Sequence, residues 1–347
     1  MLGIILLVVS ISVLVAQFAS AQTDINSSIN ITSNTTRAVT DPLPSWKDGA
    51  TKQRINDFVE NVTDAGNTKY YIPPEDRIAV FDNDGTLWSE KPLYFQVYFA
   101  IDRVEDLVTK RPELREKSPF KEILENNLTA LKDMTEEDAM NLMLTTHSNI
   151  SQAEFDSLVQ QWAETAKHPE TQRKFVDMVY QPMIELISYL KAHQFKTYIV
   201  SGGGIDFMRE ALSHIYGIPP EQIVGSSIKY QFNDSNTGNS TIFRKAELNS
   251  FDDKAEKPAN IQLHIGKVPV IAVGNSDGDL QMLQYTNDNN DKGKSLILMV
   301  HHDDPVREYS YDKKAEKVLE ESRKNNWNII SMKDDFKDIY PIGKSTR

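Results

Sequence analysis

Two aspartates, Asp82 and Asp84, directly follow a short apolar run, and their spacing suits phosphate chemistry. Side chains at positions i and i+2 share one side of a strand, so both carboxylates can face a pocket just beyond its end. Burying two like charges is costly unless a cation joins them, and Mg²⁺ prefers oxygen ligands. One carboxylate can attack phosphorus, and the other can protonate the leaving oxygen and later deprotonate water. The alternative is an ordinary turn, in which Asp, Asn and Gly are favoured.

Three further polar segments could complete such a site. Ser201-Gly202-Gly203 offers a hydroxyl and backbone N–H groups at a predicted helix N-terminus, which suits either anion binding or helix capping. Lys257 could neutralise phosphate and the nucleophile; Lys254 competes for that role, and either lysine can instead be a solvated surface residue. The third segment contains Asn275, Asp277 and Asp279, which could provide oxygen ligands for a metal or could simply form another turn.

The intervening residues predict the elements that position these segments. Short apolar runs predict five buried strands, at Arg77–Phe81, Thr197–Val200, Ile223–Ser226, Val268–Val273 and Ser295–Val300. Apolar residues at helical spacing predict helices at Asp48–Val62, Met183–His193, Ile205–Tyr216 and Pro258–Ile265, and another helix from Leu280. Residues 227–247 predict a polar hairpin with a turn around Asn236–Asn239.

Residues 92–180 interrupt this alternation with a helical insert. Helical spacing recurs in Tyr94–Val108, Phe120–Leu131, Ala139–Leu144 and Phe155–Ala166. Thr135 and Ser151 each begin a capping-box pattern, which marks a helix start.

Alternating strands and helices indicate a parallel sheet with helices on both faces. In such sheets ligands bind beyond the carboxyl ends of the strands, where the polar segments lie, so we expect one shared site. His301 and His302 end the fifth predicted strand. They could contact the metal, substrate or leaving group, or be hydrogen-bonded polar residues without a catalytic role.

The order of these motifs resembles the haloacid dehalogenase-like hydrolase superfamily, in particular its phosphatase branch with phosphoserine phosphatase-like helical caps. Phe81-Asp82-Asn83-Asp84-Gly85-Thr86-Leu87 looks like the first motif and Val200-Ser201-Gly202 like the second. Glu256-Lys257-Pro258 looks like the third, and Gly274-Asn275-Ser276-Asp277-Gly278-Asp279 resembles the fourth. The resemblance covers residues 75–305.

The resemblance implies an α/β fold with a Rossmann-like, doubly wound parallel sheet core at residues 46–91 and 181–347, and a helical cap at 92–180 inserted after the first strand. It assigns Asp82 as nucleophile and Asp84 as general acid and base. The implied phosphate binders are Ser201, Gly202 and Lys257, and the implied Mg²⁺ ligands are Asp82, Asp84, Asn275 and Asp279.

One departure from the family pattern concerns the metal. Many members have Asp where this chain has Asn275, which implies weaker metal binding, and Asp277 is an extra carboxylate that could compensate. Dehalogenases resemble the chain at Asp82 but generally lack the second Asp and the metal. Asp84 therefore favours hydrolysis of small phosphomonoesters through an aspartyl-phosphate over dehalogenation.

The N-terminus predicts export. Leu2–Val15 is almost entirely apolar and Ala19-Ser20-Ala21 follows, which favours a secretory signal at 1–21 cleaved after Ala21. The run is nearly long enough to span a bilayer, so an uncleaved anchor that tethers the chain to a membrane is the alternative. Residues 22–45 predict a flexible polar stalk. Glycosylation sequons begin at Asn26, Asn30, Asn34, Asn61, Asn127, Asn149, Asn233 and Asn239.

Composition narrows the remaining choices. The net charge of −12 disfavours nucleic-acid binding, which needs clustered Lys and Arg. The absence of cysteine excludes disulfides, thiolate zinc sites and a cysteine nucleophile. We predict a secreted or membrane-anchored phosphatase acting on a small phosphorylated substrate, and the sequence indicates no protein partner. A non-catalytic surface binding protein on the same fold and a metal-independent dehalogenase are the alternatives.

Overall fold

The computed structural model describes residues 41–127, 134–234 and 238–342. The predicted signal or anchor at 1–21 and most of the predicted stalk lie outside these residues. Across the described ranges, no helix combines the length and apolar character needed to cross a membrane.

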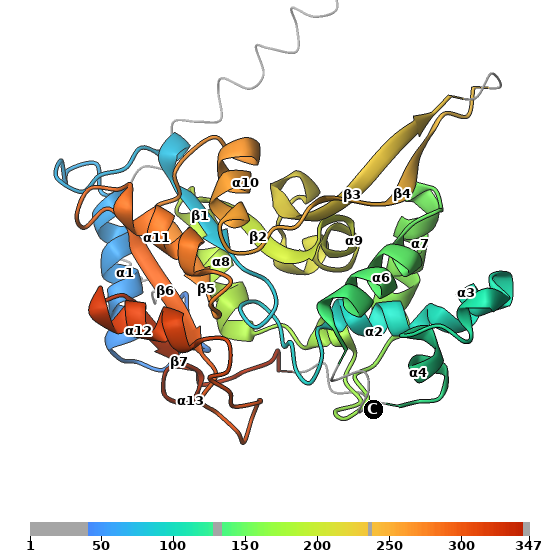
Figure 1. The fold of residues 1–347 in the computed structure, drawn as a ribbon. Helices are drawn as coiled ribbons and strands as arrows, with labels where there is room; N and C mark the ends of the chain where they lie inside the picture. The colour runs from blue at the N-terminus through green and yellow to red at the C-terminus, as the bar shows by residue number, and fades with distance from the viewer. Residues whose placement is uncertain (1–40, 128–133, 235–237, 343–347) are drawn as a thin grey trace, which may run out of the picture. The chain divides into compact units, whose positions relative to one another are not determined.

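A seven-stranded sheet forms the centre of the fold, in the order β4-β3-β2-β1-β5-β6-β7 (Figure 1). All neighbouring strands pair in parallel except β3 and β4, which form an antiparallel hairpin. The strands are β1 (Ile78–Phe81), β2 (Lys196–Gly204), β3 (Ile223–Asn233), β4 (Thr241–Ser250), β5 (Ile271–Gly274), β6 (Leu296–His301) and β7 (Asn328–Ser331). The five predicted strands and the antiparallel pairing of the predicted hairpin are confirmed, and β7 was not predicted. Part of the predicted turn around Asn236–Asn239 lies outside the described residues.

Helices cover both faces of the sheet, which confirms the predicted doubly wound α/β core. On one face lie α1 (Ala50–Thr63), α8 (Gln181–Ala192) and α9 (Ile205–Tyr216), and on the other α10 (Glu256–His264), α11 (Leu280–Asp288) and α12 (Glu316–Lys324). Strand β1 is buried throughout; Ala79 and Phe81 pack on the first face, and Ile78 and Val80 on the second. A short helix, α13 (Met332–Asp335), follows β7. Because β1 is central and buried, the side chains at its end are held on a rigid element.

The described elements between residues 92 and 180 are helices and 3-10 turns. The helices are α2 (Phe95–Asp102), α3 (Val104–Lys110), α4 (Phe120–Leu124), α6 (Glu136–His147) and α7 (Gln152–Thr165). The segment predicted as one helix at Tyr94–Val108 is two helices that meet at Arg103. The predicted helix starts are correct: the side chains of Thr135 and Ser151 accept from backbone N–H groups three residues on.

This helical insert packs directly on the sheet core, and both belong to one compact unit, Pro42–Arg347. Its aromatic rings join the main core: Phe95 contacts Trp88 at a ring-centroid distance of 4.8 Å, and Phe99 contacts Phe207 at 5.4 Å. Backbone hydrogen bonds also join residues 149–150 to Arg244 of β4. The hairpin thus reaches across to α6 and α7 (Figure 1). The boundaries of a separate cap at 92 and 180 stay a prediction.

Candidate active site

Asp82 follows β1 at the carboxyl end of the sheet and is 6% exposed. Its backbone N–H donates to Val273 of β5 at 2.9 Å, which continues the ladder one residue beyond β1. Its Oδ1 accepts from Lys257 Nζ at 2.7 Å. The nucleophile predicted from the sequence is therefore fixed both by its backbone and by its side chain.

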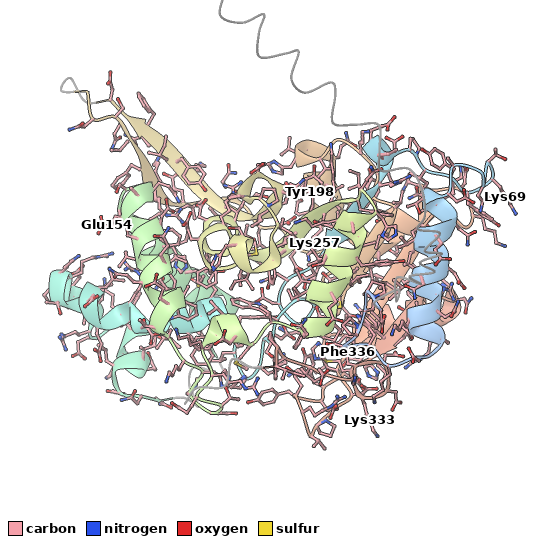
Figure 2. All side chains as sticks on the ribbon, turned by 180° about the vertical axis from the view of Figure 1, so that it is seen from behind. Lys69, Glu154, Tyr198, Lys257, Lys333 and Phe336 are labelled. Atoms are coloured by element: carbon pink, nitrogen blue, oxygen red, sulfur yellow. The ribbon has the colours of Figure 1, made fainter. Side chains whose placement is uncertain are left out.

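Lys257 joins the ends of three strands from α10. Its ammonium group donates to Asp82 Oδ1 and Asp279 Oδ1, each at 2.7 Å, and to the carbonyl of Val200 at 2.8 Å. Lys257 is 2% exposed and lies within the core in Figure 2. The competing Lys254 has a side chain that is 69% exposed and pairs with Asp253 instead. The structure thus brings Lys257, and not Lys254, to Asp82.

The charges in this cluster, which we call the catalytic cluster (Asp82, Asp84, Lys257 and Asp279), do not balance. Burial and the charge of Asp279 raise the pKa of Asp82 well above its usual range, although Lys257 opposes both effects. Burial alone would lower the pKa of Lys257, but the charges of Asp279 and Asp82 outweigh it and raise that pKa. One ammonium group therefore lies among three carboxyl groups, of which Asp82 and Asp279 are buried and Asp84 is partly buried, and an additional cation would favour their ionised forms.

Asp84 belongs to the loop directly after β1, residues 82–86, which we call the nucleophile loop, and it faces the segment that ends β2. Its Oδ1 accepts from Trp88 Nε1 at 2.8 Å. A Cβ added to Gly203 would lie 3.4 Å from both Asp84 Oδ2 and Ser201 Oγ, so these two groups share one neighbourhood. Burial first, and then the charge of Glu90, raises the pKa of Asp84 to about 6 despite the Trp88 hydrogen bond. A carboxyl group of this acidity can both give and take a proton near neutral pH.

The Ser201–Gly204 segment forms a bulge at the end of β2. Its register against β3 shifts between Ser201 and Gly204. The Ser201 hydroxyl accepts from Gly203 N at 3.1 Å, and Ser226 donates to the Gly202 carbonyl at 2.7 Å. These contacts hold the loop in place at the start of α9, where backbone N–H groups favour an anion.

A group from the helical insert also reaches this loop. Gln96 of α2 accepts from Gly204 N at 2.8 Å through Oε1, and its Nε2 lies 3.1 Å from His147 Nε2. Sequence analysis did not single out Gln96. No local pattern marks it, because its contact spans 108 residues of sequence.

Oxygen atoms suited to a hard cation converge beside Asn275. The side-chain amide satisfies its neighbours when its nitrogen faces the Asp84 carbonyl at 3.0 Å and Asp82 Oδ2 at 3.1 Å. Rotating the amide by 180° would instead turn its oxygen toward these two atoms. We call the space between Asp82 Oδ2, the Asp84 carbonyl oxygen and the Asn275 amide the metal pole. In the described part of the chain, no three Asp, Glu or His side chains gather in a metal-binding group. The donor set at the pole therefore comprises one carboxylate, one backbone carbonyl and one amide, all oxygen ligands that fit Mg²⁺.

The other acidic residues of the fourth motif face elsewhere. Both oxygens of Asp279 are occupied: Oδ1 accepts from Lys257, and Oδ2 accepts from the backbone N–H groups of Asn275 and Ser276, each at 2.9 Å. Asp279 thus orients Lys257 and the motif loop, and its role as a metal ligand stays a prediction. Asp277 Oδ1 accepts from Val318 N at the start of α12, so it caps a helix and does not join the pole.

The two histidines after β6 differ in environment. His301 Nε2 lies 2.7 Å from Asp312, whose side chain is 67% exposed, so this pair lies at the surface. His302 is buried, and its Nε2 lies 2.7 Å from the carbonyl oxygen of Gly85 in the nucleophile loop. His302 therefore contacts the loop that carries Asp82 and Asp84.

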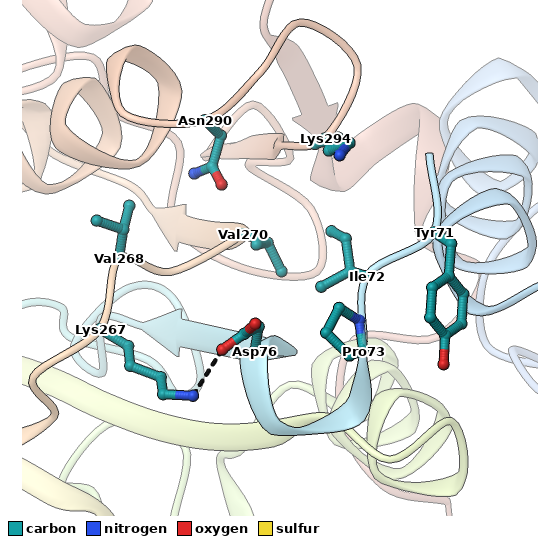
Figure 3. Close-up of a pocket in the computed structure, with 9 residues that line it drawn as sticks. All are labelled: Tyr71, Ile72, Pro73, Asp76, Lys267, Val268, Val270, Asn290 and Lys294. Carbon is teal, nitrogen blue, oxygen red and sulfur yellow. Dashed lines mark hydrogen bonds and ion pairs between the residues drawn. The ribbon is translucent and has the colours of Figure 1, made fainter. Parts of the chain in front are cut away.

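A pocket of about 340 Å³ lies at the opposite end of the sheet (Figure 3). It is lined by residues that precede β1 and β5, among them Asp76 and Val270. Two of its lining residues, Lys267 and Asp76, pair with each other at 2.6 Å, and Lys294 is the third charged residue in the lining. It holds none of the motif residues, and the chemistry lies at the carboxyl ends.

Comparison with known proteins gave one family match and several similar solved structures. The family model for haloacid dehalogenase-like hydrolase matches residues 79–284. A protein of unknown function from Bordetella pertussis Tohama I is 13% identical, with a TM-score of 0.48, and the match covers 73% of this chain and 97% of that chain. A functionally unknown protein from Anaerococcus prevotii DSM 20548 is 14% identical, with a TM-score of 0.49 and coverage of 85% and 96%. A phosphoserine phosphohydrolase-like protein from Francisella tularensis is 19% identical, with a TM-score of 0.38 and coverage of 70% and 92%. Comparison with curated protein sequences gave no match.

Proposed function

The chain belongs to the haloacid dehalogenase-like hydrolase family, and from this premise we propose that it is a Mg²⁺-dependent phosphatase that hydrolyses small phosphomonoesters outside the cytoplasm. The observation that carries the proposal is the pair of carboxyl groups at the end of β1, buried Asp82 held by Lys257 and partly buried Asp84 two residues further on. A nucleophile alone serves several reactions, whereas the second carboxyl group supplies the proton that a phosphate ester's leaving oxygen requires.

The first step forms an aspartyl-phosphate. An oxygen of the Asp82 carboxylate attacks phosphorus, the bond from phosphorus to the ester oxygen breaks, and protonated Asp84 gives its proton to the leaving alcohol. Lys257 neutralises the incoming phosphate, and the Ser201 hydroxyl with the following backbone N–H groups binds its oxygens. The raised pKa of Asp84, about 6, is suited to this proton transfer.

The second step releases phosphate. Asp84, now ionised, takes a proton from water, whose oxygen attacks the same phosphorus. The bond from phosphorus to the Asp82 oxygen breaks, which releases inorganic phosphate and regenerates the Asp82 carboxylate. Mg²⁺ at the metal pole would be held by Asp82 Oδ2, the Asp84 carbonyl and the Asn275 amide oxygen, and would neutralise charge on the phosphate. The excess of carboxyl groups over cations supports this assignment, because the pKa values of Asp82 and Asp84 are both raised and a bound cation would favour their ionised forms.

The location is proposed from the N-terminal sequence. The apolar segment Leu2–Val15 with Ala19-Ser20-Ala21 supports export, through either a cleaved signal or an anchor. Water is the plentiful acceptor there, which favours hydrolysis over transfer of phosphate to a second metabolite.

The test is phosphate release from p-nitrophenyl phosphate by the purified chain, with Mg²⁺ and with EDTA. We expect turnover that needs Mg²⁺, and a loss of at least about 10³-fold on Asp82→Asn because the nucleophile is removed. Asp277→Asn is the matched control. It also replaces one aspartate that follows a strand of the sheet, but the Asp277 carboxylate accepts from the N-terminus of α12 and does not face Asp82. Turnover that survives Asp82→Asn would disprove the mechanism.

Two other outcomes identify the alternatives. Release of halide from a haloacid without metal would indicate a dehalogenase. Binding of phosphate esters without any turnover would indicate a non-catalytic binding protein. Asn275 favours this alternative, because it stands where many family members have a carboxylate.

A further inference from the structure

A buried histidine that this mechanism does not use lies behind the nucleophile loop. The side chains of His302 and Glu308 are 1% and 0% exposed, and His302 Nδ1 lies 3.2 Å from Glu308 Oε2. The other ring nitrogen, Nε2, lies 2.7 Å from the carbonyl oxygen of Gly85. Because a carbonyl oxygen only accepts, Nε2 carries a proton and donates to Gly85.

The ring has little freedom to move. Tyr180 donates to Glu308 Oε1 at 3.0 Å, which fixes the carboxyl group that holds His302. Tyr311 stacks on the imidazole with a centroid distance of 4.4 Å and an angle of 20° between the ring planes. These partners come from the segment before α8 and the loop after β6, so distant parts of the chain hold one ring against one carbonyl.

Gly85 lies where a small displacement would disturb the metal pole. Its φ of +78° is a conformation that L side chains rarely adopt, and a Cβ on Gly85 would lie 2.1 Å from the side-chain amide of Asn275. Its N–H, which belongs to the same peptide group as the Asp84 carbonyl, donates to Trp88 O at 2.8 Å. Gly85 therefore has the Asp84 carbonyl on one side and the Asn275 amide on the other, and its carbonyl contact with His302 restrains both.

We propose that His302, held by Glu308, is a positioning residue for the nucleophile loop. Its hydrogen bond fixes the Gly85 peptide and thereby holds the Asp84 carbonyl and Asn275 in the arrangement that binds Mg²⁺. The inference rests on the proposed function. Groups that orient metal ligands in this way typically contribute about 10- to 100-fold to metal affinity or activity.

Two substitutions separate the hydrogen bond from the bulk of the ring. His302→Gln keeps an N–H donor near the position of Nε2, whereas His302→Asn ends near Nδ1 and cannot reach Gly85. We expect His302→Asn to lower Mg²⁺ affinity and kcat about 10- to 100-fold, with KM less affected, and His302→Gln to lower both less than about fivefold. His301→Asn is the matched control, because that side chain is partly exposed and pairs with surface Asp312, and we expect values close to those of the unchanged chain.

Mg²⁺ affinity is measured by titration calorimetry without substrate, and kcat and KM by p-nitrophenyl phosphate turnover per folded molecule. Equal losses in the Gln and Asn variants, or a folded Asn variant with unchanged affinity and kcat, would overturn the proposal; a purely structural role would lower only the melting temperature. If the His302→Asn variant does not fold, the Glu308→Gln variant tests the proposal instead. We expect this variant to bind Mg²⁺ roughly three- to tenfold more weakly, because its side chain holds His302 less firmly. Unchanged Mg²⁺ affinity in this variant would overturn the proposal. If the unchanged chain shows no turnover, the proposed function fails, while the affinities still test the role of His302.

Discussion

Two polar clusters in this molecule are built around buried charged residues but differ in how those charges are paired. In the catalytic cluster, one ammonium group, Lys257, faces the buried carboxyl groups of Asp82 and Asp279, with Asp84 beside them. The second cluster, which we call the cap joint, comprises Asp206, Arg244, His147 and Tyr230 and lies where the β3–β4 hairpin meets the helical insert. In the cap joint, Arg244 forms an ion pair with Asp206.

Every strong donor and acceptor of the cap joint that we describe has a partner. Arg244 Nε donates to the carbonyl of His147 at 2.7 Å, and its guanidinium lies 3.8 Å from the centre of the Phe155 ring. Tyr230 donates to Asp206 at 2.7 Å. Asp206 also pairs with Arg209 at 3.4 Å, so the carboxylate of this cluster has two cationic partners and no carboxylate is in excess. The two clusters are both largely buried, and they differ in the ratio of carboxyl groups to cations. An excess of carboxyl groups, more than burial, therefore marks the site of chemistry.

Breaking the cap joint should give the largest effect on stability. Arg244→Met removes the closer of the two cations beside buried Asp206 and leaves only the partly exposed Arg209 at 3.4 Å, and removing one partner of a buried pair typically costs about 3–5 kcal/mol. We expect a lower free energy of unfolding by about this amount in urea titrations. Turnover per folded molecule should change little, because Arg244 contacts no predicted site residue.

Lys245→Met is the matched control on the same strand. Its side chain is 38% exposed and pairs with Glu247 at the surface, where such pairs contribute about 0–1 kcal/mol. If Arg244→Met costs no more than this control, the cap joint does not stabilise the fold and the comparison fails.

The pH dependence of stability sharpens the comparison further. Burial, followed by the charges of Arg244 and Arg103, lowers the pKa of His147 to about 3. An unfolded chain binds this proton near pH 6.5 and the folded chain does not, so the contribution of His147 is present above pH 6.5 and is lost as the pH falls toward 3. At pH 4.5 the loss should be about 2–3 kcal/mol.

His147→Gln removes the titrating group and keeps a polar side chain. We expect the difference in unfolding free energy between pH 7.5 and pH 4.5 to shrink by about 2 kcal/mol in urea titrations. The exposed His264→Gln serves as the control and should leave this difference unchanged. An unaltered pH profile in the His147 variant would show that the ring is protonated in the folded state.

Local patterns were enough to predict most of the sheet and the principal acids. Buried strands leave continuous apolar runs, and residues at their ends converge in a parallel sheet, which is why Asp82, Ser201 and Lys257 could be brought together from sequence. Strand β7 was missed because Asn328-Ile329-Ile330-Ser331 has only two apolar residues and is only partly buried. Arg103 divides α2 from α3 within an unbroken apolar pattern, so that break depends on packing.

The positions of individual polar atoms could not be predicted in this way. Asp277 and Asp279 are equally acidic neighbours, yet one caps α12 and the other holds Lys257. Gln96 and His302 act through partners 108 and 217 residues away. Which atom faces which is decided by such contacts, and spacing along the chain does not encode them.

The smallest effect we predict concerns the residue by which this chain departs from its family. If the Asn275 amide oxygen is a metal ligand, Asn275→Asp adds a full negative charge at the metal pole, which already has Asp82 Oδ2 and the Asp84 carbonyl. We expect Mg²⁺ to bind about tenfold more tightly, equivalent to about 1.4 kcal/mol, in titration calorimetry.

Without metal the same charge repels the carboxyl groups beside it, so the melting temperature should fall in EDTA and recover in Mg²⁺. Asp277→Asn, which alters the carboxylate that caps α12, should leave the affinity unchanged. Weaker binding of Mg²⁺ by the Asn275→Asp variant would show that the metal does not bind at the metal pole. The catalytic cluster would then still differ from the cap joint in its excess of carboxyl groups, but this excess would not explain Mg²⁺ binding beside Asn275.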